Sequence, residues 1–512
     1  MLWHIIKKEF HQNIITSRFI IGTILCIIFM IAVKITLLDE QRMMIDAYNR
    51  KSTENENKFK EFYVYSTITT EALKPPEPLA IFHEGVSKKL GGVVSIKRQE
   101  IPYESSHYVL DNPFLGIFQS IDVVLIFKLV MSLLALLFAF DMFSGEKENG
   151  TLKLVLSTRV SRAQLFMGKY FGGLLSLTAA LFLSFIIGLL ILLFAPFIKF
   201  SLDMFIRILL IYFISIIFTA SFFSIGALIS CATHRSVVSL AISLFIWVVL
   251  VIALPNLGDY IGSQLKKVEQ SRIVADRIAA IDQEFRQVLK DYREKNPSPK
   301  DWVISGSLNM NAARFDFQIA TKNIMDYLEH FIPFCETEMR EYSIRAFQER
   351  KKYLDDLLLQ AKIVNYFTIF SPVRLYEISM KIIARTDIAS HLNYLDQTRI
   401  YRDQMLQYFG DKNVYHQYRF STIMERGEAP DVIFNVFDKE SEGAKIWEAT
   451  REKINYETRD HLNLDDFPRF HYQPVKLSES LYKGLPFFAG LIIFILIFIL
   501  ITYYCFVRYD VR

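Results

Sequence analysis

The sequence predicts an α-helical polytopic membrane protein with six transmembrane helices, both termini in the cytoplasm, and a large, mainly helical extracytoplasmic domain between helices five and six. Hydrophobic residues make up 52% of its 512 residues and charged residues only 22%, which is more apolar than an ordinary soluble domain. The apolar residues collect in six blocks, each long enough to cross a hydrocarbon core of about 30 Å as a helix. Lysines and arginines gather in the short segments on one side of these blocks, which marks that side as the cytoplasm.

The chain begins with a predicted amphipathic interfacial helix at 1–17. Leu2, Ile6 and Phe10 share one helical face, while the lysines and histidines lie largely elsewhere, a pattern typical of helices in the headgroup region. A simple positively charged anchor would have nearly the same sequence. The first span is predicted at 18–38. It is not a signal peptide, because it is about 20 residues long and ends without a small-residue cleavage site.

The other five spans are predicted at 115–142, 171–195, 204–230, 236–255 and 485–507. Pro196 and Pro255 are expected to stop the third and the fifth of the six, because proline interrupts the hydrogen-bond ladder of a helix. The short segment 143–170 then lies in the cytoplasm, and the long segments 39–114 and 256–484 lie outside. Their lysines and arginines do not contradict this orientation, since long segments are translocated largely regardless of charge.

The first outer segment is expected to open with a polar, charged stretch and then to hold two β-like runs, at 62–68 and 93–101. Between the two runs lies a proline-rich stretch with Pro75, Pro76 and Pro78, and Gly91-Gly92 directly precedes the second run.

The second outer segment is predicted to be mainly helical. Apolar residues recur at alternating steps of four and three from Val274 to Tyr292, which indicates a coiled-coil seam. A second helical stretch is predicted at about 308–366, interrupted at Pro333, and a third at 372–409. The first two stretches suit an antiparallel helical arm. Two core helices of a compact domain are an equally good interpretation.

The segment between the second and third spans carries the most functional information. Asn149 or Thr151 is expected to cap a short helix that follows two carboxylates. Leu152, Val155 and Leu156 then share one face of that helix. Such an apolar ridge suits a groove on another protein. An interfacial helix lying on lipid headgroups is the alternative.

This segment resembles the signature of type-2 ABC exporter permeases. The matching run is Phe143-x-x-Glu146-x-Glu148-x-Gly150-Thr151-Leu152, followed by Leu156-Ser157 and Val160-Ser161-Arg162. In that family the run lies between the second and third transmembrane helices, as it does here. The family usually has proline where this chain has Arg159, a departure that affects the turn after the helix. The large insertion between helices five and six, and the pair Ser371-Pro372 within it, are similar to a subgroup that includes gliding-motility and copper-site-maturation permeases.

The resemblance implies a dimeric or pseudo-dimeric exporter permease in the cytoplasmic (inner) membrane, driven by a separate P-loop ATPase subunit. ATP and Mg²⁺ would bind to that subunit, and this chain would hold no cofactor. The second permease copy could be identical or a paralogue. The resemblance assigns contact with the ATPase to a coupling helix and its surroundings: Glu146, Glu148, Asn149, Gly150, Thr151, Leu152, Val155, Leu156 and Arg162.

Several kinds of chemistry have no support in the sequence. The chain lacks the G-x-x-x-x-G-K-[ST] motif that cradles nucleotide phosphates. The pair His83-Glu84 opens a near miss to the zinc motif H-E-x-x-H, with Ser87 in place of the second histidine. The four cysteines have neither metal-ligand spacing nor a predicted disulfide partner. We therefore predict no catalytic residue and no metal site, and the net charge of +4 argues against a nucleic-acid partner.

Three ionisable residues are expected inside or at the ends of the spans: Asp122, Lys128 and Arg207. Such residues are functional candidates because charge is costly in lipid. Asp122 and Arg207 lie near the outer ends of their helices and could reach the headgroups. Lys128 lies deeper, where it could meet an anionic substrate group, pair with Asp122 or extend outward. A structural role for Lys128 is the interpretation that we favour.

Two other classes of function compete with a permease. The chain could be a membrane-anchored interaction or scaffold protein whose working part is the outer domain, with an extracytoplasmic protein partner. It could also be an ion-coupled transporter, although the sequence has no inverted repeat and no helices interrupted at matching positions.

Overall fold

Six helices in the described part of the computed structural model are long and apolar enough to cross a membrane. They are α2 (Ser17–Lys58), the broken helix Val123–Glu148, α8 (Arg162–Leu193), α9 (Leu202–Ala232), the broken helix Ser236–Leu265, and α17 (Leu477–Val507). The structure describes residues 2–108, 122–157, 160–299, 305–309, 314–431, 440–454 and 459–509. The six predicted spans are therefore confirmed, although residues 115–121 of the second lie outside the described residues.

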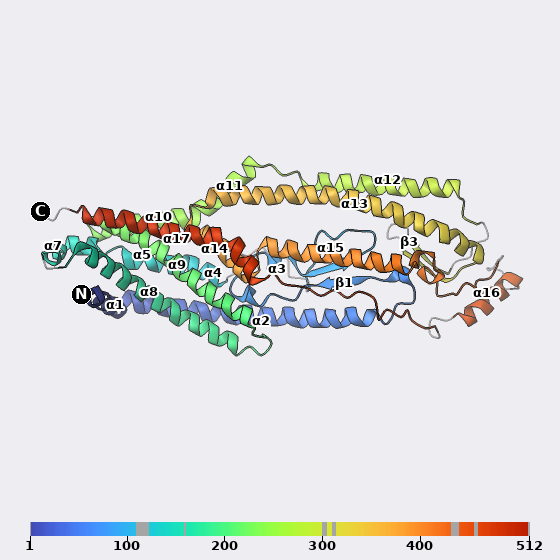
Figure 1. Cartoon of the computed structure of the whole chain (residues 1–512), viewed down its shortest axis with the longest axis horizontal. Coiled ribbons are helices and arrows are strands. Elements are labelled where there is room, and N and C mark those ends of the chain that lie inside the picture. The colour runs from blue at the N-terminus through green and yellow to red at the C-terminus, as the bar shows by residue number, and fades with distance from the viewer. Residues whose placement is uncertain are drawn as a thin grey trace.

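The molecule is elongated, with the six spans at one end and a larger domain at the other (Figure 1). We call the six spans the membrane bundle, and we call the described residues within 59–108 and 266–476 the distal domain. The helix α9 lies at the centre of the bundle, because more of it is buried than of any other span. Both ends of the chain lie at the end of the molecule that is farthest from the distal domain, close to the short helix α7 (Figure 1).

The first helix, α1 (Leu2–Ile15), packs along α8 and is separated from α2 at Thr16. Two glycines of α8 permit this close approach. A Cβ on Gly168 would lie 2.5 Å from Cγ2 of Ile5, and one on Gly172 would lie 2.6 Å from Cβ of Glu9. The predicted N-terminal helix is thus present, and the structure places it against the third span.

The helix α2 continues about five and a half turns beyond the predicted end of the first span at residue 38. The stretch from Asp39, expected to be polar and charged, is thus helical as far as Lys58. Its polar side chains contact the backbone of the segment that follows. Asn55 accepts from the Glu71 N–H at 3.0 Å and donates to the Glu71 carbonyl at 3.1 Å, and Gln41 donates to the Glu77 carbonyl at 3.3 Å. Hydropathy shows only where the apolar block ends, so this extension was not predictable from it.

Two of the spans contain a π turn. The second is built from α4 (Val123–Ile126), a π turn at Phe127–Met131, α5 (Ser132–Ala139) and α6 (Ser144–Glu148). The fifth is built from α10 (Ser236–Val248), a π turn at Val249–Ala253 and α11 (Leu254–Leu265). The indole Nε1 of Trp247 donates a 2.8 Å hydrogen bond to Oγ of Ser132, which links the two interrupted helices.

The prediction that Pro255 ends the fifth span was wrong, since α11 continues to Leu265. The N–H of Leu254 bonds to the carbonyl of Val249 in the π pattern, and the next pair of that pattern would join the carbonyl of Leu250 to Pro255, which has no N–H. The hydroxyl of Ser371 donates to this carbonyl at 3.1 Å. Because the orphaned carbonyl has a partner, the helix can continue through the proline. Pro196 does follow the end of α8 at Leu193, as predicted.

The small sheet of the distal domain pairs β1 (Thr70–Leu73) with β2 (Val93–Ile96) in antiparallel register, with Thr70 opposite Ile96. The strand β2 lies in the predicted run 93–101. The run 62–68 is not a strand, and this prediction was wrong: it holds the 3-10 turn η1 (Tyr65–Thr67), and β1 begins two residues after the run. The short elements η2 (Pro78–Ile81) and α3 (Ser87–Leu90) lie between the two strands.

The helices α12 (Ser271–Lys295) and α13 (Lys322–Thr368) form an antiparallel pair that we call the arm (Figure 1). Ion pairs join them, with Arg277 Nε 3.1 Å from Glu349 and Arg345 Nη2 2.7 Å from Glu284. The second helix begins at Lys322 and not at 308, because the hairpin β3 (Ser305–Asn309) and β4 (Arg314–Ile319) precedes it. It also runs through Pro333 without ending.

The single helix predicted at 372–409 is two helices, α14 (Pro372–Ala384) and α15 (Ile388–Asp411). They separate at Arg385, whose φ of 57° is incompatible with a continuing helix. The helix α14 packs into the membrane bundle against α9 and α17. Tyr376 stacks on Phe218 at 4.2 Å between ring centroids and shares a 3.0 Å hydrogen bond with Ser215. This insertion of a distal segment into the bundle was not predicted.

The rest of the distal domain is an aromatic core. It includes α15 and the short elements η6 (Val414–His416) and η7 (Tyr418–Phe420). The helix α16 (Glu442–Lys453) lies at the far end of the molecule (Figure 1). The side chains of the fully buried Tyr394, Phe409 and Phe420 belong to this core, which explains much of the high aromatic content.

Candidate functional site

The segment predicted to contact a partner lies at the end of the molecule that carries both termini (Figure 1). The helix α6 ends at Glu148, and α7 (Thr151–Leu156) follows after one turn. Gly150 makes this turn with a φ of 70°, a conformation that favours glycine. Neither Asn149 nor Thr151 caps α7 through its side chain, contrary to the prediction, since the N-cap position is Gly150 itself.

The apolar ridge predicted on α7 faces inward. Leu152 is fully buried in a cluster with Phe143, Phe166 and Phe506, and Val155 and Leu156 are partly buried against the same cluster. These side chains therefore fix α7 to the membrane bundle in this structure. A role for them in direct contact with an ATPase stays a prediction.

The outward face of α7 is formed by different residues. Leu154 is 72% exposed, and its neighbours Thr151 and Lys153 are exposed as well. Glu148, Asn149 and Gly150 extend this face at the turn. Sequence reasoning missed Leu154. The signal was the helical period of about 100° per residue, which places Leu154 on the side opposite Leu152.

The start of α6 is held under the end of α9. The hydroxyl of Ser230 accepts from the N–H groups of Phe143 and Ser144 at 2.9 and 3.0 Å. The carboxylate of Glu148 accepts from the N–H of Ser236 at 2.9 Å, at the first residue of α10. Two of the signature positions thus connect the segment to the fourth and fifth spans.

Lys169 joins three elements beneath the same segment. Its Nζ lies 2.8 Å from the carboxylate of Glu146 on α6 and 3.0 Å from that of Glu9 on α1, and its side chain is only 5% exposed. Glu146 therefore points inward, to an ion pair that couples α6, α1 and α8. Sequence reasoning did not assign Lys169 a role, because its partners are distant in sequence.

Arg162 connects α8 to the end of α17, through 2.5 and 3.0 Å hydrogen bonds from Nη1 to the carbonyls of Val507 and Tyr509. The nine predicted contact residues are thus brought to one end of the molecule. They divide into inward anchors and an outward face made of Glu148, Asn149, Gly150 and Thr151, to which the structure adds Lys153 and Leu154.

The three intramembrane candidates have separate partners. Asp122 accepts from the N–H of Leu125 at 2.8 Å, which caps α4, and its other oxygen lies 2.5 Å from Nδ1 of His83. Lys128 pairs with Glu377 on α14 at 2.8 Å, and not with Asp122. This pair explains how a lysine is accommodated deep in a span, and it supports the structural role favoured from the sequence.

Arg207 is fully buried and connects the membrane bundle to the distal domain. Its guanidinium donates to Asp203 on the same helix, to the carbonyls of Ile383 and Val475, and to the hydroxyl of Ser480, at 2.9–3.1 Å. The five hydrogen-bonding protons of an arginine suit this multiple contact. The side chain thus holds α9, the end of α14 and the start of α17 together.

Lys34 is a further buried cation that sequence reasoning did not single out. Its Nζ lies 3.3 Å from the carbonyl of Ile81 and 3.3 Å from the centre of the Phe82 ring. The segment around Phe82 belongs to the distal domain, yet it packs in the core of the bundle, where Phe82 stacks on Phe185. A cation–π contact and one carbonyl therefore replace water around this charge.

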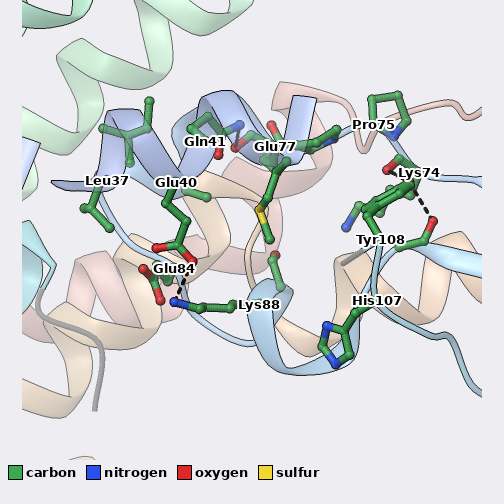
Figure 2. A pocket seen from close by; sticks show the side chains of 17 residues that line it. Leu37, Glu40, Gln41, Lys74, Pro75, Glu77, Glu84, Lys88, His107 and Tyr108 are labelled. Atoms are coloured by element: carbon green, nitrogen blue, oxygen red, sulfur yellow. Dashed lines mark hydrogen bonds and ion pairs between the residues drawn. The ribbon is translucent and has the colours of Figure 1, made fainter. Parts of the chain in front are cut away.

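Figure 2 shows a pocket of about 70 Å³ where α2 leaves the bundle. Glu40 on α2 faces Lys88 across it, with 2.5 Å between the charged atoms. Burial raises the pKa of Glu77 at its edge, and the Arg385 guanidinium at 3.3 Å offsets this effect only in part. A pocket of this size holds a few water molecules and is much smaller than the sites that bind substrates.

A model of the family described as ABC-2 family transporter protein matches residues 3–511, nearly the whole chain. No curated protein matches the chain.

Proposed function

The chain belongs to the ABC-2 transporter family as a multi-pass membrane permease component, and we propose that it couples ATP hydrolysis by a separate ATPase subunit to transport or to motion of its distal domain. ABC-2 permeases pair with ATPase subunits, and such membrane subunits are typically non-catalytic. In our proposal the ATPase holds ATP and Mg²⁺, and this chain holds neither.

The observation that carries the proposal is the outward face of α6 and α7. Leu154 stands 72% exposed on a short helix that is anchored from beneath by the fully buried Leu152. An exposed apolar side chain on a rigidly held helix suits a groove on a partner protein. The face also includes signature residues of the family, among them Glu148, Gly150 and Thr151.

The anchors beneath this face provide a route for motion. A displacement of α6 by the ATPase would act on α8 and α1 through Glu146 and Lys169, and on α10 through Glu148 and Ser236. From α9, Arg207 reaches α14 and the start of α17. The hydroxyl of Ser230 joins α6 to the end of α9, so the helix α9 connects the proposed ATPase face with the contacts of Arg207 at the distal domain.

The finer parts of the proposal rest on the sequence. The excess of lysine and arginine near the termini and in 143–170 favours a cytoplasmic location for the end that carries α7, which leaves the distal domain outside. We place the chain in the cytoplasmic (inner) membrane, as an exporter that works with a second permease copy or paralogue. The long insertion between the fifth and sixth spans supports the subgroup of gliding-motility and copper-site-maturation permeases.

The test is purification of the tagged chain from its native membrane in mild detergent, followed by mass spectrometry and an ATP-hydrolysis assay. The wild-type chain should bring a P-loop ATPase with it, and Leu154→Asp should release that subunit. Leu152→Asp is not a suitable variant, because it would bury a charge in the cluster that holds α7.

A matched control is Ile446→Asp, which makes the same change of polarity at an exposed residue of α16, at the other end of the molecule. This variant should retain the ATPase. Retention of the ATPase by Leu154→Asp would refute the assignment of the contact face. A wild-type chain that purifies alone and hydrolyses no ATP would favour the scaffold interpretation, with the distal domain as the working part.

A further inference from the structure

A large groove separates the arm from the rest of the distal domain. Its volume is about 1170 Å³. One wall is formed by α12 and α13, and the other by residues 99–104 and the side of α15, which runs parallel to the arm (Figure 1). We call this space the arm groove.

The walls of the arm groove are mainly apolar. Ile278 and Ile281 line it from α12, Leu354 and Leu358 from α13, and Leu392 from α15. All five side chains are partly exposed, although they belong to helices that pack elsewhere through fully buried residues. Apolar side chains on two facing walls gain free energy when an apolar ligand displaces water from between them.

Several charged groups at the groove are paired. Arg350 contacts the carboxylate of Glu100, and its guanidinium lies 3.7 Å from the centre of the Tyr103 ring. Arg399 pairs with Asp396 and donates to the carbonyl of Pro102 at 2.9 Å. The contact of Arg350 with Glu100 joins the two walls, and the apolar surface is the main recognition feature of the groove. A long apolar chain fits such a site better than a polar metabolite or a peptide backbone.

The arm groove begins close to an apolar surface that continues a membrane span. The broken helix Ser236–Leu265 has 30 residues, so it is about 45 Å long and exceeds the hydrocarbon thickness of about 30 Å. Its last turns expose Leu257, Tyr260 and Leu265, and the adjoining end of α13 exposes Tyr366 and Phe370, each by more than half.

This apolar surface and the groove are held in one unit. Gly258 and Gly262 bring α11 against Thr368 and Val364 of α13. Lys266 then pairs with Asp356 at 2.8 Å, and Asp356 directly precedes Leu357 and Leu358 at the near end of the groove. Exposed apolar residues therefore extend from the end of the fifth span along α11 and α13 to the arm groove, past this ion pair.

We propose that the arm groove binds an acyl chain of a phospholipid drawn from the bilayer around the membrane bundle. The continuity of the groove with the apolar end of the fifth span supports this source. The mainly apolar lining and the volume above the usual range for small-molecule sites support a long apolar ligand. Binding of this kind requires no ATP, so it stands apart from the function proposed above.

The test places the full-length chain in nanodiscs of phosphatidylethanolamine and phosphatidylglycerol that contain a phosphatidylglycerol with a diazirine in one acyl chain. After irradiation, mass spectrometry locates the label. Labelled peptides from 271–285 and 339–358 are expected beside those of the spans. A lipid that keeps both acyl chains in the bilayer core is expected to label the spans and not these peptides.

Adjacent alanines provide a matched pair of variants. Ala279 lines the arm groove and Ala280 does not, and both are exposed on α12. Ala279→Trp should narrow the groove and lower the labelling of 339–358 about tenfold, whereas Ala280→Trp should leave it unchanged. Both variants should keep the melting temperature of the wild-type chain.

Three results would overturn the proposal. The first is labelling confined to the membrane spans in a folded chain. The second is equal labelling in the two tryptophan variants. The third is labelling of the groove by a diazirine fatty acid added from solution but not by the phospholipid, which would assign the groove to a soluble ligand.

Discussion

The hydroxyl of Ser371 donates a 3.1 Å hydrogen bond to the carbonyl of Leu250, 121 residues away in the sequence. The N–H of Leu254 bonds to the carbonyl of Val249, in the π pattern. The same pattern would pair Leu250 with Pro255, which has no N–H. Ser371 is the N-cap residue of α14, and its hydroxyl donates to a carbonyl of the fifth span. It thereby replaces the N–H donor that Pro255 lacks.

Ser371→Ala should therefore leave a buried carbonyl unpaired and lower the free energy of unfolding by about 1–3 kcal/mol. Pro255→Ala restores an N–H at the position where the π pattern needs one. The double variant should lose less stability than Ser371→Ala alone, and Pro255→Ala alone should be nearly neutral. Thermal unfolding in detergent of the wild type, the two single variants and the double variant gives the interaction energy of this double-mutant cycle. Equal losses in the single and double variants would show that Ser371 does not act through this carbonyl.

Lys169 neutralises two carboxylates at a buried position, so its removal should be costly. Lys169→Met leaves Glu9 and Glu146 close together without a cation, and a loss of about 3–5 kcal/mol is expected. Adding Glu9→Gln and Glu146→Gln should restore most of the stability, because the buried charges are then gone.

The same triple variant separates stability from coupling. If Lys169 transmits motion between α6, α1 and α8, the triple variant should still bind the ATPase. The rate of ATP hydrolysis by that bound ATPase should then no longer change in the way that it changes when the wild-type permease is bound. Lys169→Arg, which keeps the charge, is the control and should retain most of that response. A triple variant with normal coupled hydrolysis would show that the ion pairs serve stability alone.

The contact of α11 with α13 depends on two glycines. A Cβ on Gly262 would lie 2.2 Å from Cγ2 of Val364, so Gly262→Ala should cost about 1–3 kcal/mol through overpacking. Adding Val364→Ala removes the clash and should recover part of this loss. Gly410→Ala is the control, because Gly410 is helical and has open space around its Cα; it should be neutral or slightly stabilising. Differential scanning fluorimetry in detergent ranks the variants.

The labelling rate of the Cys335 thiol should show whether the aromatic core of the distal domain stays closed. Burial raises the pKa of its thiol to about 12, and the side chain is 1% exposed. The reactive thiolate is then depleted on the order of a thousandfold at pH 8 relative to an unperturbed thiol. Iodoacetamide should label Cys335 slowly between pH 7 and pH 9 in the native chain, and rapidly in denaturant. Peptide mass spectrometry gives the rates, and rapid native labelling would indicate that this core opens.

Much of the membrane bundle was predictable because hydropathy acts locally. A span of about 20 apolar residues has no other stable state in lipid than a helix, so six blocks gave six spans. The boundaries failed where the helix continued in polar sequence, as in 39–58, or passed through Pro255 with help from Ser371. Both exceptions depend on a partner segment that is distant in the chain.

The candidate site shows the same division. The resemblance to the family located the segment 143–162 correctly between two spans, and the helical period placed Leu152, Val155 and Leu156 on one face. The helical period could not predict which face of α7 is exposed and which is buried. The bundle buries Leu152 against Phe143, Phe166 and Phe506, so Leu154 is presented to the surroundings.

The sequence alone determined that this chain has six segments long and apolar enough to cross a membrane as helices and a run that resembles a family signature after the second, because composition and short-range spacing are properties of contiguous residues. Only the tertiary structure decided that Lys128 meets Glu377, that Lys169 meets Glu146 and Glu9, and that α14 enters the bundle. A buried charged side chain pairs with the oppositely charged group that packing places next to it. Two equally hydrophobic faces of a helix differ only in which one packs against a neighbouring element and is buried.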